Sequence, residues 1–341
     1  METILFLTHT ETDGSLGKPA LEALGAANRL TTAVSGQLVV ALFGETVQPA
    51  ADQIATCGAT RFLAVSGAEF GTSRYATDAA AAEALCRAAQ ASIIIAPATS
   101  RANRSLPSVA FRLDGSVDTH VTGILTEGGK ISTTRWYYRQ RMEAVQQRAK
   151  RPWLILLDPG TQTPWSGVAA TVQVELVPVA LSDKLKRTTV TGTREPSADA
   201  QTIRPDAALL FVAGAGWTKK QADGQTHVPE AERLILNFLH ATRASLGSTK
   251  SLVDWGGEGQ AVLSFLTHFN QVGQTGSTPR HPKGLAACCH GEEPHTVGWR
   301  FVTERRAVNL DPNCGWARGK ADVLYVADAF AVISKVNELL A

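Results

Sequence analysis

One hexapeptide in the C-terminal half carries an unusual density of groups that can hold a polar ligand. It consists of Gln271, Val272, Gly273, Gln274, Thr275 and Gly276. Its glycines permit a tight turn that presents backbone amides, and the threonine adds a hydroxyl. Because a carboxamide both donates and accepts hydrogen bonds, the set predicts recognition of a phosphate, or of a ring with donors and acceptors.

A second pair of glycines, Gly214 and Gly216, follows an apolar run. We expect a strand over 207–213, a Gly-Ala-Gly turn, and an amphipathic helix over 231–246 with a proline just ahead of it. Glycines at such a turn let backbone N–H groups approach the phosphates of a dinucleotide. The third glycine of the dinucleotide fingerprint is absent, so this pattern alone only permits such a site.

The cysteines do not indicate a metal site. Cys57, Cys86, Cys288, Cys289 and Cys314 include no C-x-x-C spacing, which argues against zinc and iron–sulfur centres. Adjacent residues of a strand point to opposite faces, so the neighbouring pair is interpreted as small core residues rather than a redox couple. We predict no metal and no catalytic residue.

Alternating strands and helices position these groups. In the first 180 residues the apolar runs predict strands over 4–8, 37–43, 61–65 and 92–97, and helices over 18–30 and 75–90. This order predicts an α/β fold whose parallel sheet has helices on both faces.

The pattern changes between residues 118 and 158. Two runs rich in β-branched and aromatic residues surround a Glu-Gly-Gly turn, which predicts an antiparallel hairpin. Residues 135–151 hold six basic residues and one acidic residue. This excess has two interpretations: a charged edge that resists aggregation, or a docking patch for an acidic partner.

A polar segment at 181–205 contains two prolines and no periodicity, and is interpreted as a linker. It separates an N-terminal α/β scaffold domain, 1–180, from a C-terminal Rossmann-like α/β domain, 206–341. In the second domain we also expect strands near 285–289 and 306–310 and a closing helix over 329–340.

Charge and length narrow the class of protein. The 341 residues carry 33 Lys and Arg against 31 Asp and Glu, so bulk charge does not indicate a nucleic-acid binder. No apolar run reaches the length of a membrane span, and the N-terminus lacks a basic leader region. We therefore expect a cytoplasmic protein. Charged residues are only 19% of the chain, which indicates a surface buried against another protein.

The hexapeptide Gln-Val-Gly-Gln-Thr-Gly resembles the flavin-binding signature of the α subunit of electron transfer flavoproteins. His295, Gly298 and the Asn-Leu-Asp-Pro run at 309–312 follow in the order of that family's C-terminal domain, and Asp322 resembles its last FAD contact. Residues 96–115 resemble the family's second signature. The resemblance covers nearly the whole chain and identifies it as a divergent α subunit.

The resemblance implies one FAD in the C-terminal domain. Thr275 would lie at flavin N5, and His295 would face the N1/O2 edge, where a donated N–H stabilises the negative charge that develops on one-electron reduction. The resemblance also implies FAD contacts in the glycine turns, at the flavin ring and at the adenosine end of the cofactor. These are Gly214, Gly216, Thr249, Lys250, Gln271, Val272, Gly273, Gln274, Gly276, His290, Gly291, Asn309, Asp311 and Asp322.

Of three departures from the family pattern, two concern arginines and the third concerns the length of one segment. Trp217 closes a Gly-Ala-Gly-Trp run in place of Gly-Gly-Arg-Gly, Lys250 stands for an arginine, and the chain between 254 and 271 is longer than the family pattern. A lysine keeps the charge of arginine but not its planar fork. With fewer cations nearby, we expect a lower flavin potential than in members that keep both arginines, which a spectroelectrochemical titration measures.

The implied partners are a β subunit that carries AMP, a flavin-dependent dehydrogenase as electron donor, and a quinone reductase or an iron–sulfur oxidoreductase as acceptor. The departures favour a specialised donor, such as a dehydrogenase of amine or N-methyl amino acid catabolism. Two alternatives remain open. One is an NAD-dependent enzyme on a deoxyhypusine synthase-like fold, and the other is a nucleotide-binding interaction subunit that has lost its flavin.

Overall fold

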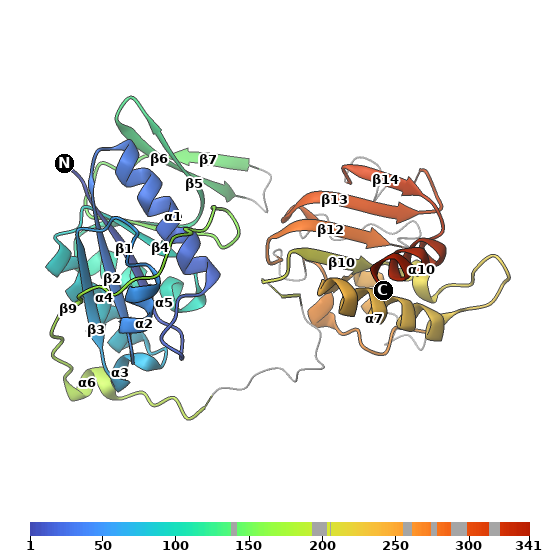
Figure 1. The fold of residues 1–341 in the computed structure, drawn as a ribbon, viewed down its shortest axis with the longest axis horizontal. Coiled ribbons are helices and arrows are strands. Elements are labelled where there is room, and N and C mark those ends of the chain that lie inside the picture. The colour runs from blue at the N-terminus through green and yellow to red at the C-terminus, as the bar shows by residue number, and fades with distance from the viewer. Residues whose placement is uncertain are drawn as a thin grey trace. The chain divides into compact units, whose positions relative to one another are not determined.

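The computed structural model describes residues 1–137, 142–192, 203–204, 206–254, 261–273, 278–287, 299–313 and 321–341. The chain forms two compact units, Met1–Arg194 and Glu195–Ala341, and each is built on its own sheet (Figure 1). The division between the units lies inside the polar segment 181–205. As expected from the sequence, the fold is α/β with a sheet dominated by parallel strands in each unit.

A nine-stranded sheet forms the centre of the first unit, and its strands run in the order β7-β6-β5-β8-β4-β1-β2-β3-β9. Its inner parallel strands are continuous apolar runs because helices cover both of their faces. These strands are β1 (Thr3–His9), β2 (Gln37–Gly44), β3 (Arg61–Ser66), β4 (Ile93–Pro97) and β8 (Trp153–Leu157).

The helices of the first unit divide between the two faces of this sheet, as Figure 1 shows. One apolar layer holds α1 (Lys18–Ala33) and α2 (Gln48–Gln53). The other holds α3 (Ala68–Gly71), α4 (Tyr75–Ala89) and α5 (Ser100–Arg112). The strands and helices expected from the first 100 residues are thus confirmed within one to three residues at their ends.

An antiparallel extension continues the sheet beyond β8. The hairpin consists of β5 (Ser116–Glu127) and β6 (Lys130–Tyr137), and β7 (Met142–Gln146) pairs with β6. Gly128 and Gly129 form the turn with φ of 55° and 75°, which side-chain-bearing residues rarely adopt. The hairpin prediction is confirmed, but the sequence interpretation missed β8 inside the same region, and β8 is a buried parallel strand.

Two expectations about helices are corrected by the structure. The segment 181–205 was expected to lack helical structure, yet it contains the one-turn helix α6 (Asp183–Lys186), which follows the short edge strand β9 (Glu175–Leu176). The helix expected over 231–246 is α7 (Val228–Thr242). It ends early because Arg243 adopts a left-handed conformation, φ 53°, and the next strand begins at Ser245.

Five parallel strands make the sheet of the second unit, in the order β11-β10-β12-β13-β14. They are β10 (Leu209–Ala213), β11 (Ser245–Ser248), β12 (His281–Ala287), β13 (Val302–Asn309) and β14 (Val323–Val326). One face packs against α7 and α10 (Ala329–Leu340). The short elements at the ends of strands are η1 (Ala215–Thr218), α8 (Lys250–Asp254) and η3 (His268–Asn270). The sequence interpretation did not anticipate β14.

Arg204 fastens the start of the second unit to its sheet. Its N–H donates to Ser245 Oγ at 2.7 Å, and its carbonyl lies 2.8 Å from Nε2 of the buried His281. His281 Nδ1 lies 2.7 Å from the Pro279 carbonyl. The imidazole therefore joins the segment that precedes β10 to the first residue of β12.

Replacing this histidine should weaken the second unit. We expect His281→Ala to lower the free energy of unfolding by about 1–3 kcal/mol, because the imidazole ring is buried and its N–H loses a partly buried carbonyl acceptor. Hydrogen exchange of β12 peptides measures this loss. Lys283→Ala, at an exposed position of the same strand, is the control. Equal protection in both variants would contradict the role given to His281.

Candidate functional site

Each parallel sheet has a place where its strand order reverses, and open α/β sheets bind ligands at the carboxyl ends of the strands beside such a reversal. In the first unit the reversal lies between β1 and β4, and in the second it lies between β10 and β12. The two places differ in how much space and how many unpaired polar groups they offer.

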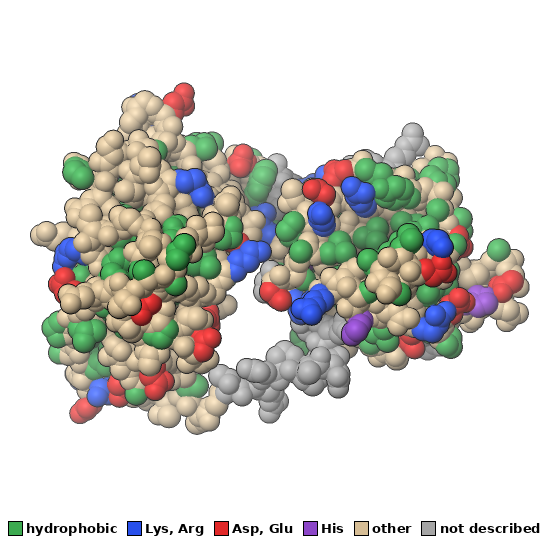
Figure 2. Space-filling view, viewed as in Figure 1, with side chains coloured by type: hydrophobic (Ala, Val, Ile, Leu, Met, Phe, Trp, Pro, Cys, Tyr) green, Lys and Arg blue, Asp and Glu red, His purple; other side chains and the backbone are tan. Residues whose placement is uncertain are grey.

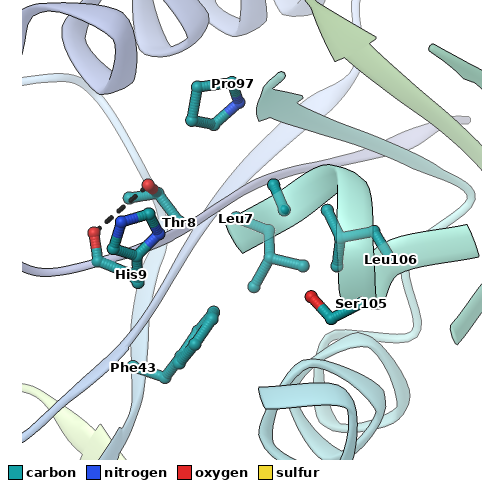
Figure 3. Close-up of a pocket in the computed structure, with 8 residues that line it drawn as sticks. Leu7, Thr8, His9, Phe43, Pro97, Ser105 and Leu106 are labelled. Atoms are coloured by element: carbon teal, nitrogen blue, oxygen red, sulfur yellow. Dashed lines mark hydrogen bonds between the residues drawn. The ribbon is translucent and has the colours of Figure 1, made fainter. Parts of the chain in front are cut away.

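The reversal in the first unit opens only into a small cavity (Figure 3). Its wall includes His9, Phe43, Pro97, Ser105 and Leu106, and its volume is about 10 Å³, roughly the space of one water molecule. A nucleotide therefore does not fit among these side chains.

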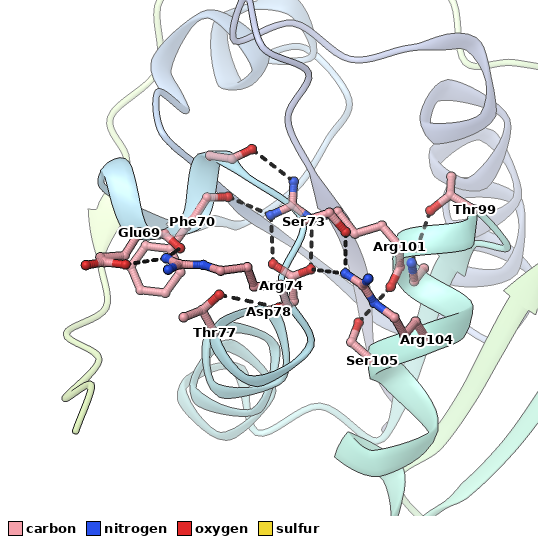
Figure 4. A network of polar contacts seen from close by, with 12 residues as sticks. Glu69, Phe70, Ser73, Arg74, Thr77, Asp78, Thr99, Arg101, Arg104 and Ser105 are labelled. Carbon is pink, nitrogen blue, oxygen red and sulfur yellow. Dashed lines mark hydrogen bonds and ion pairs between the residues drawn. The ribbon is translucent and has the colours of Figure 1, made fainter. Parts of the chain in front are cut away.

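The buried ion pair between Arg101 and Asp78 lies beside this cavity (Figure 4). Arg101 Nε and Nη2 donate to the two carboxylate oxygens of Asp78 at 2.9 and 2.7 Å. Nη2 also donates to the Phe70 carbonyl at 2.6 Å, and the guanidinium lies 5.2 Å from the centre of the Phe43 ring. Since its donors already have partners within the chain, Arg101 closes the crevice instead of offering charge to a ligand.

His9 ends β1 at this cavity and is held neutral. Burial, and to a lesser degree the positive charge of Arg101, lower the pKa of His9 from 6.5 to about 4. As the pH falls, the unfolded chain therefore takes up its proton before the folded chain does. The stability that His9 contributes is complete above about pH 6.5 and is lost as the pH falls towards 4.

His9→Gln should remove this pH dependence. We expect wild type to lose roughly 2–3 kcal/mol more than the variant between pH 7 and pH 4. Hydrogen exchange of β1 peptides over this range measures the difference, with the exposed His240→Gln as control. Parallel curves for wild type and His9→Gln would refute the neutral, buried state of His9.

The carboxyl ends of the second sheet lie level with one another. Ala213 is paired with both Ser248 and Ala287, and Ala287 with Val308. Two further bonds extend this alignment past the strand ends. Gly214 N–H donates to the Ala287 carbonyl and Thr249 N–H donates to the Ala213 carbonyl, both at 2.9 Å.

The glutamine-glycine hexapeptide begins at this same edge. Gln271 forms a parallel bridge with Ser248, and Val272 N–H donates to the Ser248 carbonyl at 3.0 Å. Gly273 has a φ of 77°, and its N–H donates to Thr278 Oγ1 at 2.8 Å. A Cβ on Gly247 would lie 2.7 Å from the Val272 side chain, so this glycine allows the close approach.

Three polar side-chain atoms at this edge are buried and have no hydrogen-bond partner among the described residues. They are Ser248 Oγ, Thr249 Oγ1 and Asn309 Nδ2. The three residues are 0%, 2% and 5% exposed. A buried polar group without a partner costs about 1–3 kcal/mol. A polar ligand that supplied donors and acceptors here would remove that cost. The sequence interpretation named Thr249 and Asn309 but missed Ser248, the last residue of a strand too short to be noticed.

The Gly-Ala-Gly turn is followed by a buried tryptophan. Gly214 precedes η1, and Gly216 lies within it, where its carbonyl accepts from Gln221 Nε2 at 3.0 Å. Trp217 is fully buried and packs against Phe330 with ring centres 4.6 Å apart. Trp217, the last residue of the run that stands in place of Gly-Gly-Arg-Gly, therefore contributes to the core.

The three candidate residues near the C-terminus, Asn309, Asp311 and Asp322, lie in two places. Asn309 ends β13 and its Oδ1 accepts from Asp311 N–H at 3.1 Å, which keeps both residues at the carboxyl edge. Asp322 precedes β14 and lies beside Arg305, well before the end of β13. Arg305 donates to both its carboxylate oxygens, and this contact lowers the pKa of Asp322. The structure therefore does not bring Asp322 to the edge that holds Asn309.

The other named site residues lie outside the described part of the chain: Gln274, Thr275, Gly276, His290, Gly291 and His295. Cys288, Cys289 and Cys314 also lie outside it. The two described cysteines, Cys57 and Cys86, are buried, and burial raises the pKa of both thiols. No group of three or more potential metal ligands occurs among the described residues.

The basic run at 135–151 is largely neutralised where it is described. Arg148 pairs with Asp118 at 2.8 Å, Arg151 pairs with Glu2 at 2.9 Å, and Lys150 pairs with Asp114. On the face of the first unit that Figure 2 shows, cationic side chains are scattered among acidic and apolar ones. The described residues therefore favour the interpretation as a charged edge over that of a docking patch.

Comparison with known proteins gives one match. Residues 4–184, just over half of the chain, match the model described as the electron transfer flavoprotein domain. No curated protein matches the chain. None of the described helices is long and apolar enough to cross a membrane.

Proposed function

Since the chain belongs to the electron transfer flavoprotein family, whose members are electron carriers, we propose that it is the FAD-binding α subunit of such a carrier. The FAD is held by the second unit, at the carboxyl edge of its sheet. The single observation that carries this assignment is a set of buried polar atoms at that edge that have no hydrogen-bond partner in the described part of the chain, Ser248 Oγ, Thr249 Oγ1 and Asn309 Nδ2.

The residues present fit a dinucleotide. The strand order of the second sheet is the doubly wound order that accepts a flavin at its reversal point. The unpartnered hydroxyls supply hydrogen bonds to phosphate or ribitol oxygens, and the Asn309 amide supplies a donor. Gln271 is fixed beside them by its bridge to Ser248, so the hexapeptide begins at the same edge.

The reversal point of the first unit supports the choice of the α subunit, because the cavity there is too small for a nucleotide. This point is occupied by the Arg101–Asp78 pair and the Phe43 ring, and the cavity that the described residues form there has a volume of about 10 Å³. A unit closed in this way serves as a scaffold, and in this proposal the scaffold contacts the β subunit, which holds any AMP.

FAD supplies the redox chemistry when bound, because it can take up and release one or two electrons. The chain binds the cofactor, orients it and excludes water around it. In this proposal the electrons come from a flavin-dependent dehydrogenase, for which a dehydrogenase of amine or N-methyl amino acid catabolism is our candidate. They pass to a quinone reductase or an iron–sulfur oxidoreductase.

Thr249→Val tests the cofactor site directly. Valine has nearly the shape of threonine but no hydroxyl, so it removes a buried group that has no hydrogen-bond partner among the described residues. We therefore expect the thermal midpoint of the flavin-free protein to stay constant or to rise. The dissociation constant for FAD should increase about tenfold, the loss of roughly one hydrogen bond.

Thr242→Val is the matched control, because the Thr242 hydroxyl already donates to the Phe238 carbonyl at 2.6 Å. It should lower stability without changing FAD affinity. Flavin absorbance of the purified wild-type chain, followed by fluorescence titration of each variant, gives both quantities. A wild-type protein that neither carries nor rebinds FAD would overturn the proposed function.

A further inference from the structure

Helix α5 of the first unit carries one large apolar side chain that faces water. Phe111 is 87% exposed, more than any other large apolar side chain of the described helices. The opposite face of α5 is packed in the ordinary way, because Leu106, Val109 and Ala110 are buried in the apolar layer against the sheet. A single exposed apolar residue is common on protein surfaces, so the groups around it decide whether it has a role.

Arg104 lies on the same outer face of α5, seven residues and therefore about two turns before Phe111. Its guanidinium lies 3.9 Å from Asp78 Oδ2 and is about half-exposed. Asp78 is buried and already accepts two hydrogen bonds from Arg101, at 2.9 and 2.7 Å (Figure 4). One carboxylate therefore faces two guanidinium groups, which leaves one positive charge in excess.

A second excess charge lies at the end of α5. Glu83 accepts from Arg87 at 2.9 Å and from Arg112, the neighbour of Phe111, at 3.3 Å. Here too one carboxylate faces two guanidinium groups. Asp114 adds no net charge, because it is paired with Lys150.

The exposed surface made by Arg87, Arg104, Phe111 and Arg112 is called the α5 patch below. Its three arginines and Arg101 carry four positive charges against the two negative charges of Asp78 and Glu83. The surface around the phenyl ring therefore has an excess of two positive charges.

This composition fits a transient docking site better than a permanent subunit interface. The centres of permanent interfaces are apolar and depleted in charged residues, whereas charged side chains surround the single apolar side chain of the α5 patch. A partner that complements the patch has carboxylates around an apolar pocket. Opposite charges would steer the encounter, and the ring would leave water on contact.

Among the partners in the proposed function, the electron donor fits this chemistry. Amines are cations, and a dehydrogenase that attracts cationic substrates benefits from a negative field around its active site. The carboxylates that make this field would also attract the α5 patch. A quinone reductase or an iron–sulfur oxidoreductase has no cationic substrate that calls for such a field.

We propose that the α5 patch docks the electron-donating dehydrogenase, with Phe111 in an apolar pocket of that enzyme and the arginines against carboxylates at the rim of the pocket. This inference rests on the proposed function, because only an electron carrier has such a donor. Docking on the first unit holds the donor on the chain that carries the FAD, which raises the effective concentration of the cofactor around it.

The test uses the FAD-loaded carrier with its natural subunits, and a purified flavin-dependent amine dehydrogenase as donor. Stopped-flow absorbance follows the FAD of the carrier, which is reduced while the reduced flavin of the donor is oxidised. Phe111→Ala removes the apolar group, and Arg104→Gln removes one charge. The matched controls are Val168→Ala, at a side chain 76% exposed in the same unit, and Lys130→Gln, at an exposed lysine of β6.

We expect Phe111→Ala to raise the donor concentration for half-maximal reduction about thirtyfold, the loss typical of a central interface residue. Arg104→Gln should slow association at low salt about threefold and weaken its salt dependence. Both variants should keep the maximal reduction rate and the FAD content of wild type, since neither side chain belongs to the cofactor site. The two controls should behave like wild type.

The negative outcomes are distinguishable. If wild type holds no FAD, or if the donor does not reduce it, the proposed function or its donor is wrong and this inference fails with it. If wild type is reduced but Phe111→Ala behaves like Val168→Ala, this inference alone is wrong.

The other possible occupants of the patch give different results. If Phe111→Ala loses the β subunit, or a dimer of this chain, in size-exclusion chromatography with light scattering, the patch is a permanent interface and the proposal is overturned. Slower reoxidation by the acceptor with unchanged reduction by the donor would overturn it as well, because the acceptor would then be the partner.

Discussion

The hydrogen bonds that level the ends of β10, β11 and β12 determine what the second unit can bind. Thr249 donates to Ala213 and Gly214 donates to Ala287, each by its backbone N–H at 2.9 Å. These two bonds bring residues from distant parts of the chain to one edge. The edge thereby collects hydroxyls and an amide that are buried before any ligand arrives, at a cost in stability that a bound dinucleotide would offset.

The two units have related sheet topologies, but the polar groups at their reversal points differ. In the first, the reversal point is closed by Arg101 and Asp78, two charges that satisfy each other inside the protein. In the second, polar atoms at the equivalent edge have no partner among the described residues. Breaking the pair in the first unit would leave a buried charge, which costs more than the pair itself contributes. This asymmetry is consistent with the scaffold role that the proposed function gives to the first unit.

Much of the fold could be predicted because strands and helices leave local patterns. The Gln37–Gly44 strand is a continuous apolar run, and the Tyr75–Ala89 helix is rich in alanine. The strands that the sequence interpretation missed have different causes, since β11 lacks such a pattern whereas β8 and β14 are apolar runs. β11 has four residues with two serines and a glycine, and β8 stands next to a hairpin that dominates its surroundings. For the candidate site, residue types pointed to Thr249 and Asn309, but not to Ser248.

The sequence by itself determined the alternation of elements, the polar segment between the units and the resemblance of the hexapeptide to a flavin-binding signature, since each depends on neighbouring residues. Only the tertiary structure decided which side chains share an edge. In the structure Asp322 lies away from Asn309, and Trp217 packs in the core. Most of the described basic residues at 135–151 pair with carboxylates that are distant in the sequence. Pairing between strands and ion pairs across long stretches of chain depend on contacts that no local pattern records.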